Sequence, residues 1–234
     1  MLGARIGGFA ASLAAILAAA QAVGAEFSGY VTATSDYVRR GVTQSDGGPA
    51  LQLALDVEFD SGIYAGAWGS TVDIASGGAR TRDVESNYYL GYAVDAGERW
   101  RIGGNVVWYE YPGSRGSVRY DYVEYSATAG FDDWLWIEFA WSPDFYHSGR
   151  ATRALDVYAE IPVATNWLVG GGGGYYDVSD FAGHGFGYWQ LGVTRVLSLV
   201  DVDLRYHDTS RYAFPVSTPD RSDPRLSLSI RYAF

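Results

Sequence analysis

The sequence has 234 residues, with 27 Asp and Glu against 17 basic residues, all of them Arg, and a formal net charge of −10. An acidic chain without a basic stripe argues against a nucleic-acid partner, because phosphate binding needs clustered positive charge. Cys is absent, which excludes disulfides and cysteine nucleophiles. His occurs only at positions 147, 184 and 207, so we expect no metal site and no cofactor.

The first 25 residues have the pattern of a secretory signal peptide. Arg5 supplies the positive start, an apolar stretch of 12 residues runs from Phe9 to Ala20, and small residues follow. A helix needs about 20 apolar residues to span a bilayer, so this stretch is too short for a membrane anchor. Cleavage after Ala22 or after Ala25 fits the small-residue pattern. We predict a signal peptide at residues 1–25 and one exported domain at residues 26–234.

The exported part alternates apolar and polar side chains with the two-residue period of a β-strand. The alternation is clearest at residues 51–59, 200–207 and 225–234. The 30 Gly and 16% aromatic residues are also typical of a β protein with many turns. Strands are predicted at residues 27–38, 49–59, 63–72, 84–95, 99–111, 119–131, 134–142, 153–162, 166–176, 185–196, 199–208 and 225–234.

Short and long connections alternate along the chain. Short turns such as Asp132-Asp133 and Leu197-Ser198 separate longer polar loops. Outer-membrane barrels combine short turns at one end, long external loops at the other and an even number of strands. We therefore predict an up-and-down antiparallel transmembrane β-barrel of about 12 strands. The long external loops are expected at residues 39–48, 73–83, 112–118, 143–152, 177–184 and 209–224.

The apolar face is assigned to lipid, although a soluble sandwich also alternates and turns its apolar face inward. Lys is missing, charges gather in loops and on the polar face, and aromatic residues lie near strand ends. Amphipathic rings prefer the depth of the lipid headgroups, which favours the membrane reading. Aromatic girdles are expected from Tyr37, Tyr92, Trp100, Trp141, Trp189, Tyr206 and Tyr232.

The last strand ends on an aromatic residue of its apolar face. Tyr232 and Phe234 resemble the C-terminal signal by which the outer-membrane assembly machinery recognises barrels. The resemblance implies two partners, that machinery and outer-membrane lipid, and a location in the outer membrane of a Gram-negative cell.

Two blocks near the start of the exported part resemble a known family. Residues 29–45 (GYVTATSDYVRRGVTQS), followed by Gly48-Pro49-Ala50-Leu51-Gln52, are similar to the opening of the TorF family of porins. Residues 61–73 resemble the second block of that family, and the later strands agree in length and pattern. The resemblance implies a porin. Position 39 is Arg where many relatives have an apolar or aromatic residue.

If the apolar face meets lipid, the polar face lines a lumen. Twelve tilted strands leave a bore of about 12 Å between inward side chains, which suits small hydrophilic solutes. The carboxylate excess favours cations. Arg205 is expected to form a network with its neighbours on the last two strands. The residues predicted to line the lumen are Asp56, Glu58, Glu85, Arg101, Glu124, Glu138, Asp156, Glu160, Asp201, Asp203, Arg205, His207, Arg225 and Arg231.

The sequence therefore predicts a passive porin with a cation preference and no enzymatic activity. One alternative is a non-conducting structural barrel whose external loops bind a ligand or partner. A second is a hydrolase at the rim, with His207 beside Asp208 or His147 beside Asp144. The run Gly170–Gly174 lacks the context of a phosphate loop and indicates a kink, or room for a neighbouring chain or inserted loop. The solute, the oligomeric state and the path of residues 209–224 stay open.

Overall fold

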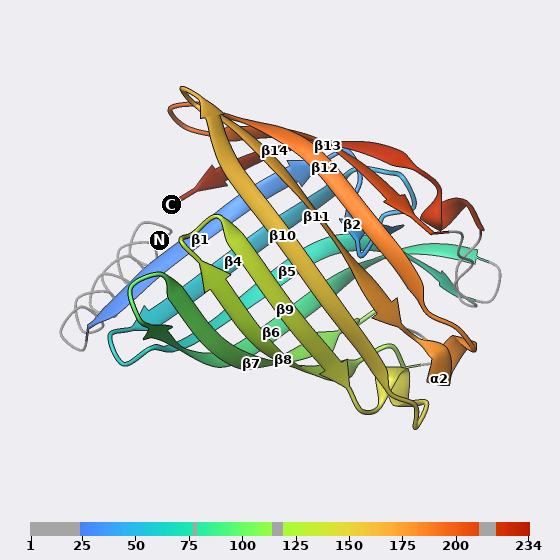
Figure 1. The fold of residues 1–234 in the computed structure, drawn as a ribbon. Coiled ribbons are helices and arrows are strands. Elements are labelled where there is room, and N and C mark those ends of the chain that lie inside the picture. The colour runs from blue at the N-terminus through green and yellow to red at the C-terminus, as the bar shows by residue number, and fades with distance from the viewer. Residues whose placement is uncertain (1–23, 77–78, 114–118, 211–218) are drawn as a thin grey trace, which may run out of the picture.

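The computed structural model describes residues 24–76, 79–113, 119–210 and 219–234. These residues form a closed antiparallel barrel of twelve strands, which confirms the predicted fold (Figure 1). Residues 1–23 of the predicted signal peptide lie outside the described residues. The barrel strands are β1 (Ala25–Thr34), β4 (Ala50–Phe59), β5 (Ile63–Ser76), β6 (Ala79–Ala96), β7 (Trp100–Glu110), β8 (Tyr122–Phe131), β9 (Leu135–Ser142), β10 (Thr152–Ala164), β11 (Trp167–Asp177), β12 (Phe186–Val196), β13 (Asp201–Thr209) and β14 (Arg225–Ala233).

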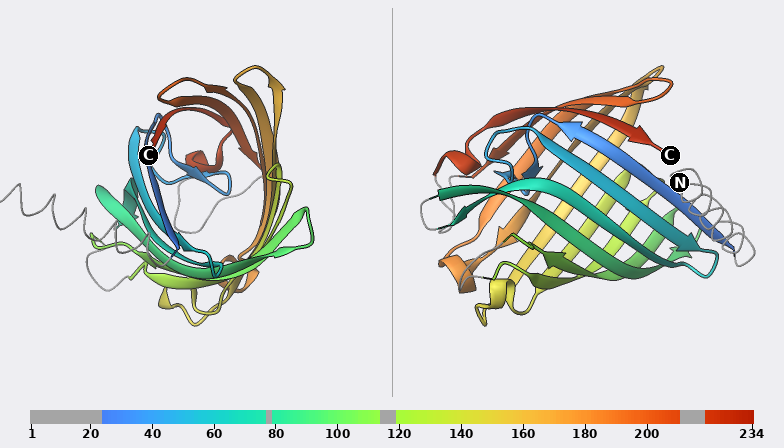
Figure 2. Two further views of the ribbon diagram at one scale, coloured as in Figure 1. Left: turned by 90° about the vertical axis from the view of Figure 1, so that its left-hand side faces the viewer. Right: turned by 180° about the vertical axis from the view of Figure 1, so that it is seen from behind.

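Each barrel strand pairs with the next along the chain, and β1 closes the barrel between β4 and β14. Tyr30 on β1 lies opposite Ala54 on one side and Ala233 on the other. The short turns lie at one end of the barrel together with the C-terminus, and the longer connections lie at the other (Figure 2). We call these the turn end and the loop end.

The outside of the barrel is apolar. Along β14, Leu226, Leu228 and Ile230 expose 63%, 48% and 47% of their surfaces, whereas Ser227 between them is only 5% exposed. Soluble proteins bury such residues and rarely expose apolar patches larger than about 300–600 Å². The apolar face of the strands therefore points outward and the polar face inward, which is the reverse of a soluble sandwich.

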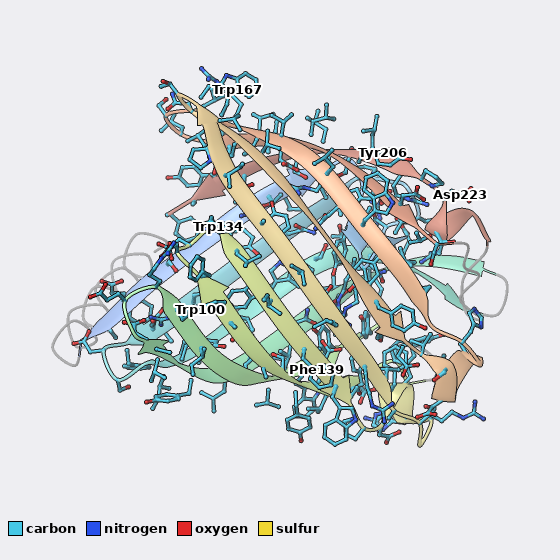
Figure 3. All side chains as sticks on the ribbon, in the orientation of Figure 1. Trp100, Trp134, Phe139, Trp167, Tyr206 and Asp223 are labelled. Carbon is cyan, nitrogen blue, oxygen red and sulfur yellow. The ribbon has the colours of Figure 1, made fainter. Side chains whose placement is uncertain are left out.

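Exposed aromatic residues gather toward both ends of the apolar surface. Trp100, Trp134 and Trp167 are exposed at the turn end, and the partly exposed Tyr206 lies in the loop half (Figure 3). The rings of Trp189 and Tyr206 are 5.3 Å apart on the outside of β12 and β13. Amphipathic rings at two levels around an apolar band have the arrangement of the girdles of membrane barrels.

One predicted girdle residue lies elsewhere. The strand expected at 27–38 ends at Thr34, because the chain leaves the wall after Ser35 and turns inward. Tyr37 therefore lies inside the barrel, where its ring is 5.3 Å from that of Trp68. The prediction of Tyr37 as a lipid-facing girdle residue is wrong.

The loop predicted at residues 73–83 is a second difference. It extends β5 and β6 into a long hairpin that stays paired as far as Ser76 and Ala79. Beyond the apolar band, water reaches both faces of a strand. The alternation of apolar and polar residues therefore disappears from the sequence, although the two strands stay paired by backbone hydrogen bonds.

Short helical segments occupy three of the loop-end connections. These are η1 (Phe145–His147), α2 (Ser179–Ala182) and η2 (Pro219–Ser222). No helix in the described part of the chain has the length and apolar character needed to cross a membrane.

Candidate functional site

A small hairpin folds into the barrel from the connection between β1 and β4. It consists of β2 (Val38–Arg39) and β3 (Val42–Thr43), and the view along the barrel shows it inside the wall (Figure 2). Arg40 and Gly41 form its turn with φ angles of 47° and 76°. Two positive φ values in a two-residue loop are those of a type I′ turn. The loop predicted outside the barrel at residues 39–48 therefore begins inside it.

Two arginines at the hairpin tip bind carboxylates of the opposite wall. Arg40 pairs with Glu124 on β8 at 3.1 Å and with Asp156 on β10 at 3.3 Å. Arg39 reaches the same Glu124 at 3.3 Å and donates a hydrogen bond of 2.7 Å to the hydroxyl of Tyr109. Glu124 is only 4% exposed. A buried carboxylate needs such partners, so these contacts fasten the tip to the wall.

The tip also touches the barrel wall at Gly41. A Cβ atom there would overlap Thr209 Cγ2 on β13 and lie 2.9 Å from Tyr188 Cβ on β12. Glycine therefore satisfies both the positive φ and the lack of space. Tyr188 donates a hydrogen bond to Asp156, so this carboxylate binds the wall and the hairpin together. The hairpin thus crosses the interior from β1 to the opposite strands.

Asp36 holds the base of the hairpin. It is 6% exposed and accepts hydrogen bonds from Thr43 Oγ1 at 2.5 Å and Ser45 Oγ at 3.0 Å. Its other oxygen pairs with Arg225 on β14 at 3.0 Å. Arg225, which was predicted as a cation of the lumen wall, therefore binds the hairpin base.

The last connection reaches the same place. Arg221 in η2 donates to the backbone oxygen of Asp73 at 2.6 Å and pairs with Asp46 at 3.5 Å. Residues 211–218 of this connection lie outside the described residues. Its described part packs beside the hairpin, and Arg221 is 9% exposed there.

Aromatic side chains fill the loop side of the hairpin. The rings of Tyr109 and Tyr122 stack 4.4 Å apart, and Phe145 of η1 packs edge-on against Tyr122 at 4.8 Å. The cavity beside the arginines on this side measures only about 80 Å³, against about 350 Å³ on the turn side. The interior is therefore wide toward the turn end and narrow at the hairpin.

The predicted network of Arg205 is correct only in part. Arg205 pairs with Asp203 at 2.8 Å on its own strand. Arg225 instead binds the hairpin base, and Arg231 lies over the ring of Tyr30 at 4.5 Å. The expected single network across β13 and β14 is therefore replaced by separate contacts around the wall.

Other predicted lumen residues form local pairs. Arg101 pairs with Glu58, and the hydroxyl of Tyr89 donates to Asp56. Glu85 is 1% exposed and lies near the hairpin, where Tyr37 approaches it at 3.5 Å. Three further predicted residues share the inward register of their strands: Glu138, Glu160 and Asp201.

Of the two histidine pairs considered for a rim hydrolase, His207 with Asp208 is not formed. His207 Nε2 lies 2.9 Å from Ser227 Oγ, and Asp208 occupies the opposite face of β13. Within the described residues no cluster of three His, Asp or Glu side chains has the geometry to hold a metal ion.

His147 lies at the loop end and binds acidic neighbours. Its Nε2 atom is 2.8 Å from Asp121, and its Nδ1 atom is 3.8 Å from Asp144. Burial raises the pKa of Asp121, but hydrogen bonds from His147 and Arg119 lower it by more, so the net shift is downward. These contacts order the loop surface outside the barrel interior.

The run Gly170–Gly174 makes room for tyrosine side chains. A Cβ at Gly170 would overlap the hydroxyl of Tyr158, and a Cβ at Gly174 would overlap that of Tyr188. β11 stays paired on both sides through the run. The inward-facing glycines therefore hold rings that lie along the wall, so the expected kink and inserted loop are wrong, while room for a neighbouring chain stays a prediction.

The same arrangement at Gly91 gives a testable prediction. The three atoms nearest to a Cβ at Gly91 all belong to the Tyr64 side chain. Gly91→Ala should push this ring into the interior, which in a conducting barrel would lower the single-channel conductance by roughly 20–50%. Gly69→Ala is the control, because its Cβ meets only an ordinary contact at 3.4 Å. Adding Tyr64→Ala to Gly91→Ala should restore the conductance, and a failure to do so would refute this explanation.

The C-terminal residue completes the closure of the barrel. The backbone groups of Phe234 and Gly29 exchange two hydrogen bonds of 2.9 Å. Tyr232 and Phe234 expose 48% and 57% of their surfaces on the outside. Both side chains therefore belong to the exposed apolar surface of the barrel, and their role as an assembly signal stays a prediction.

The sequence reading missed Arg39 and Arg40 as interior residues. The usable signal was the pattern Val38-Arg39-Arg40-Gly41-Val42, in which valines flank a turn that ends in Gly. Two adjacent cations in an acidic chain also mark a segment with carboxylate partners.

Comparisons with known proteins agree with this architecture. A sequence model of the family described as "Bacterial protein of unknown function (Gcw_chp)" matches residues 18–218. The solved structure of the NanC porin is similar with a TM-score of 0.57 and 12% identity, covering 88% of this chain and 98% of that chain. The KdgM porin in complex with disordered oligogalacturonate gives 0.54 and 9%, with coverage of 89% and 99%.

A third similar structure is the COG4313 outer membrane channel from Pseudomonas putida F1, with a TM-score of 0.51 and 10% identity, covering 90% of this chain and 95% of that chain. At such identities the likeness concerns the fold. No curated protein matches the chain.

Proposed function

The chain belongs to this bacterial family of unknown function, and we propose that it is an outer-membrane porin for the passive diffusion of small hydrophilic solutes. The observation that carries the proposal is the inverted barrel. Exposed leucines cover the outside, while paired carboxylates and arginines line the inside around a hairpin. The apolar outer face requires a lipid environment, and the charged inner face requires a hydrated interior.

The membrane location has further support in the sequence. A signal peptide at residues 1–25 would export the chain, and Tyr232 and Phe234 would present the last strand to the assembly machinery. The resemblance of residues 29–45, 48–52 and 61–73 to TorF porins accords with this location. Outer-membrane lipid, the assembly machinery and small solutes are the partners of this proposal.

The hairpin would form the constriction of the pore. Its two arginines face the wall carboxylates Glu124 and Asp156, and Glu138 lines the same cavity. Wall carboxylates outnumber the arginines of the barrel strands, so we propose a modest cation preference. The arginines at the narrowest point oppose it, which makes the reversal potential a sensitive readout.

A non-conducting barrel is the second candidate. The aromatic packing on the loop side and the small cavity left there favour it. In that case the anchored hairpin would act as a plug, and the loop surface would be the functional part.

Reconstitution in planar bilayers separates these candidates. Purified protein whose gel mobility shifts on boiling is a closed barrel, and this preparation should give discrete conductance steps. In a KCl gradient, the sign of the reversal potential should then be that of a cation-selective pore. Folded protein without any conductance step would refute the pore and leave the plugged barrel.

A further inference from the structure

A second cavity lies along the wall formed by β4–β9, on the turn side of the hairpin. It measures about 420 Å³, within the range of about 300–1,000 Å³ that is usual for small-molecule sites. Tyr109, which Arg39 of the hairpin tip contacts, is one of its lining residues. Its lining includes Trp68, Asn87, Tyr89, Asn105, Thr128 and Trp136.

Aromatic faces dominate this cavity. Trp136 pairs with Gly130 on β8 and Tyr158 on β10, and its side chain faces the interior of the barrel. It still exposes 42% of its surface there. Tyr64 and Tyr89 lie along the wall, because their hydroxyl ends occupy the space beside Gly91 and Gly66. Rings held flat against a wall present their faces to whatever enters.

These faces differ from those of other interior tyrosines. In the described parts of the barrel, guanidinium groups lie over the rings of Tyr30, Tyr109 and Tyr158, at 4.5, 4.4 and 5.3 Å. No such cation covers Trp68 or Trp136 in that part of the chain. The ring of Tyr37 already packs against Trp68 at 5.3 Å. The face of Trp136 therefore suits an uncharged ring with C–H bonds directed at the aromatic surface.

Uncharged hydrogen-bonding groups stand beside the rings. Asn87 is 9% exposed, and its Nδ2 donates to Glu85 at 3.0 Å. Its Oδ1 atom is buried and accepts no hydrogen bond from the described residues. A buried amide oxygen without a donor costs about 1–3 kcal/mol, so a ligand hydroxyl there would be favoured. Asn105 and Thr128 add further amide and hydroxyl groups.

The charges in this cavity cancel locally. Arg101 and Glu58 are the charged side chains of its lining, and they pair with each other. An acidic ligand would have to break the Arg101 pair to find a cation here. A neutral ligand keeps every pair and can use the amide and hydroxyl groups.

We propose that this cavity binds a neutral saccharide, with a pyranose ring stacked on Trp136 and a hydroxyl donating to Asn87 Oδ1. This inference rests on the proposed function, since it names the class of solute that the pore would carry. The stacking surface supplies contact area, and the amides supply orientation.

The test uses the full-length folded protein with maltose, cellobiose and digalacturonate as probes. Either neutral disaccharide should reduce the ion current in a concentration-dependent manner, and digalacturonate should do so less. Trp136→Ala and Asn87→Ala should each weaken the block about tenfold by losing the stacking face or the acceptor. Trp141→Ala is the control, because Trp141 is 40% exposed on the outer face of the same strand.

Calorimetry of the same sugars with protein in detergent micelles gives a readout that needs no current. Conductance without block or binding by either neutral sugar would overturn this inference and leave the pore intact. Binding by a neutral sugar without conductance would support the site and refute the pore. Equal weakening by Trp141→Ala would also overturn it, because the effect would then not come from the interior.

Discussion

Replacing Arg39 and Arg40 with Gln, together with Glu124→Gln, should raise the single-channel conductance at least about twofold and shift the reversal potential toward cations. The tip contacts to Glu124 and Asp156 are the anchors of the hairpin. The triple change removes two positive charges and one negative charge from the constriction, so the interior gains net negative charge. Glu124 is included because a buried carboxylate left without its arginines would destabilise the barrel by about 3–5 kcal/mol.

The measurement is a comparison of conductance and reversal potential in one KCl gradient. Arg153→Gln with Asp177→Asn is the matched control, because this pair at 3.7 Å lies at the loop end of β10 and β11 with both side chains partly exposed. The control should match the unmodified protein. If the triple variant also matched it while remaining heat-modifiable on gels, the hairpin would not line the conducting path.

The second large effect concerns the outside of the barrel. Leu228→Arg should lower the free energy of unfolding in lipid vesicles by about 1–3 kcal/mol, because a charge would face the acyl region deeper than the loop-end girdle. Leu228 lies opposite Leu204 on β13 and exposes 48% of its surface. Leu226→Arg should lower it by only about 0–1 kcal/mol, since Leu226 lies opposite Tyr206 in the loop-end girdle.

Both free energies of unfolding can be measured by denaturant unfolding in vesicles, followed by gel mobility or tryptophan fluorescence. The two variants carry the same charge, so their difference reports depth alone. Equal and small effects at positions 226 and 228 would mean that this face does not meet lipid, and the porin proposal would lose its basis.

Much of the wall was predictable from alternation. Leu53 and Ile230 are exposed on one face, whereas Glu85 and Glu124 are buried on the other. A strand with one face in lipid and one in water must alternate at every second residue, so the pattern is written into the sequence. The closed barrel of twelve strands followed from counting these segments.

The hairpin was not predictable in the same way. Residues 35–49 lack a membrane-facing side, so their polarity fits an external loop and an internal one equally well. What places them inside is pairing over long sequence distances: Arg40 with Glu124 and Asp156, and Asp36 with Arg225.

The sequence by itself thus determined the class of the wall, its strand number and which face is apolar, because these depend on the local two-residue period. Only the tertiary structure decided which charges meet, where the interior narrows and which aromatic rings are covered by a guanidinium group. Such contacts depend on closure and shear of the sheet, which bring residues from distant strands together and leave no local trace.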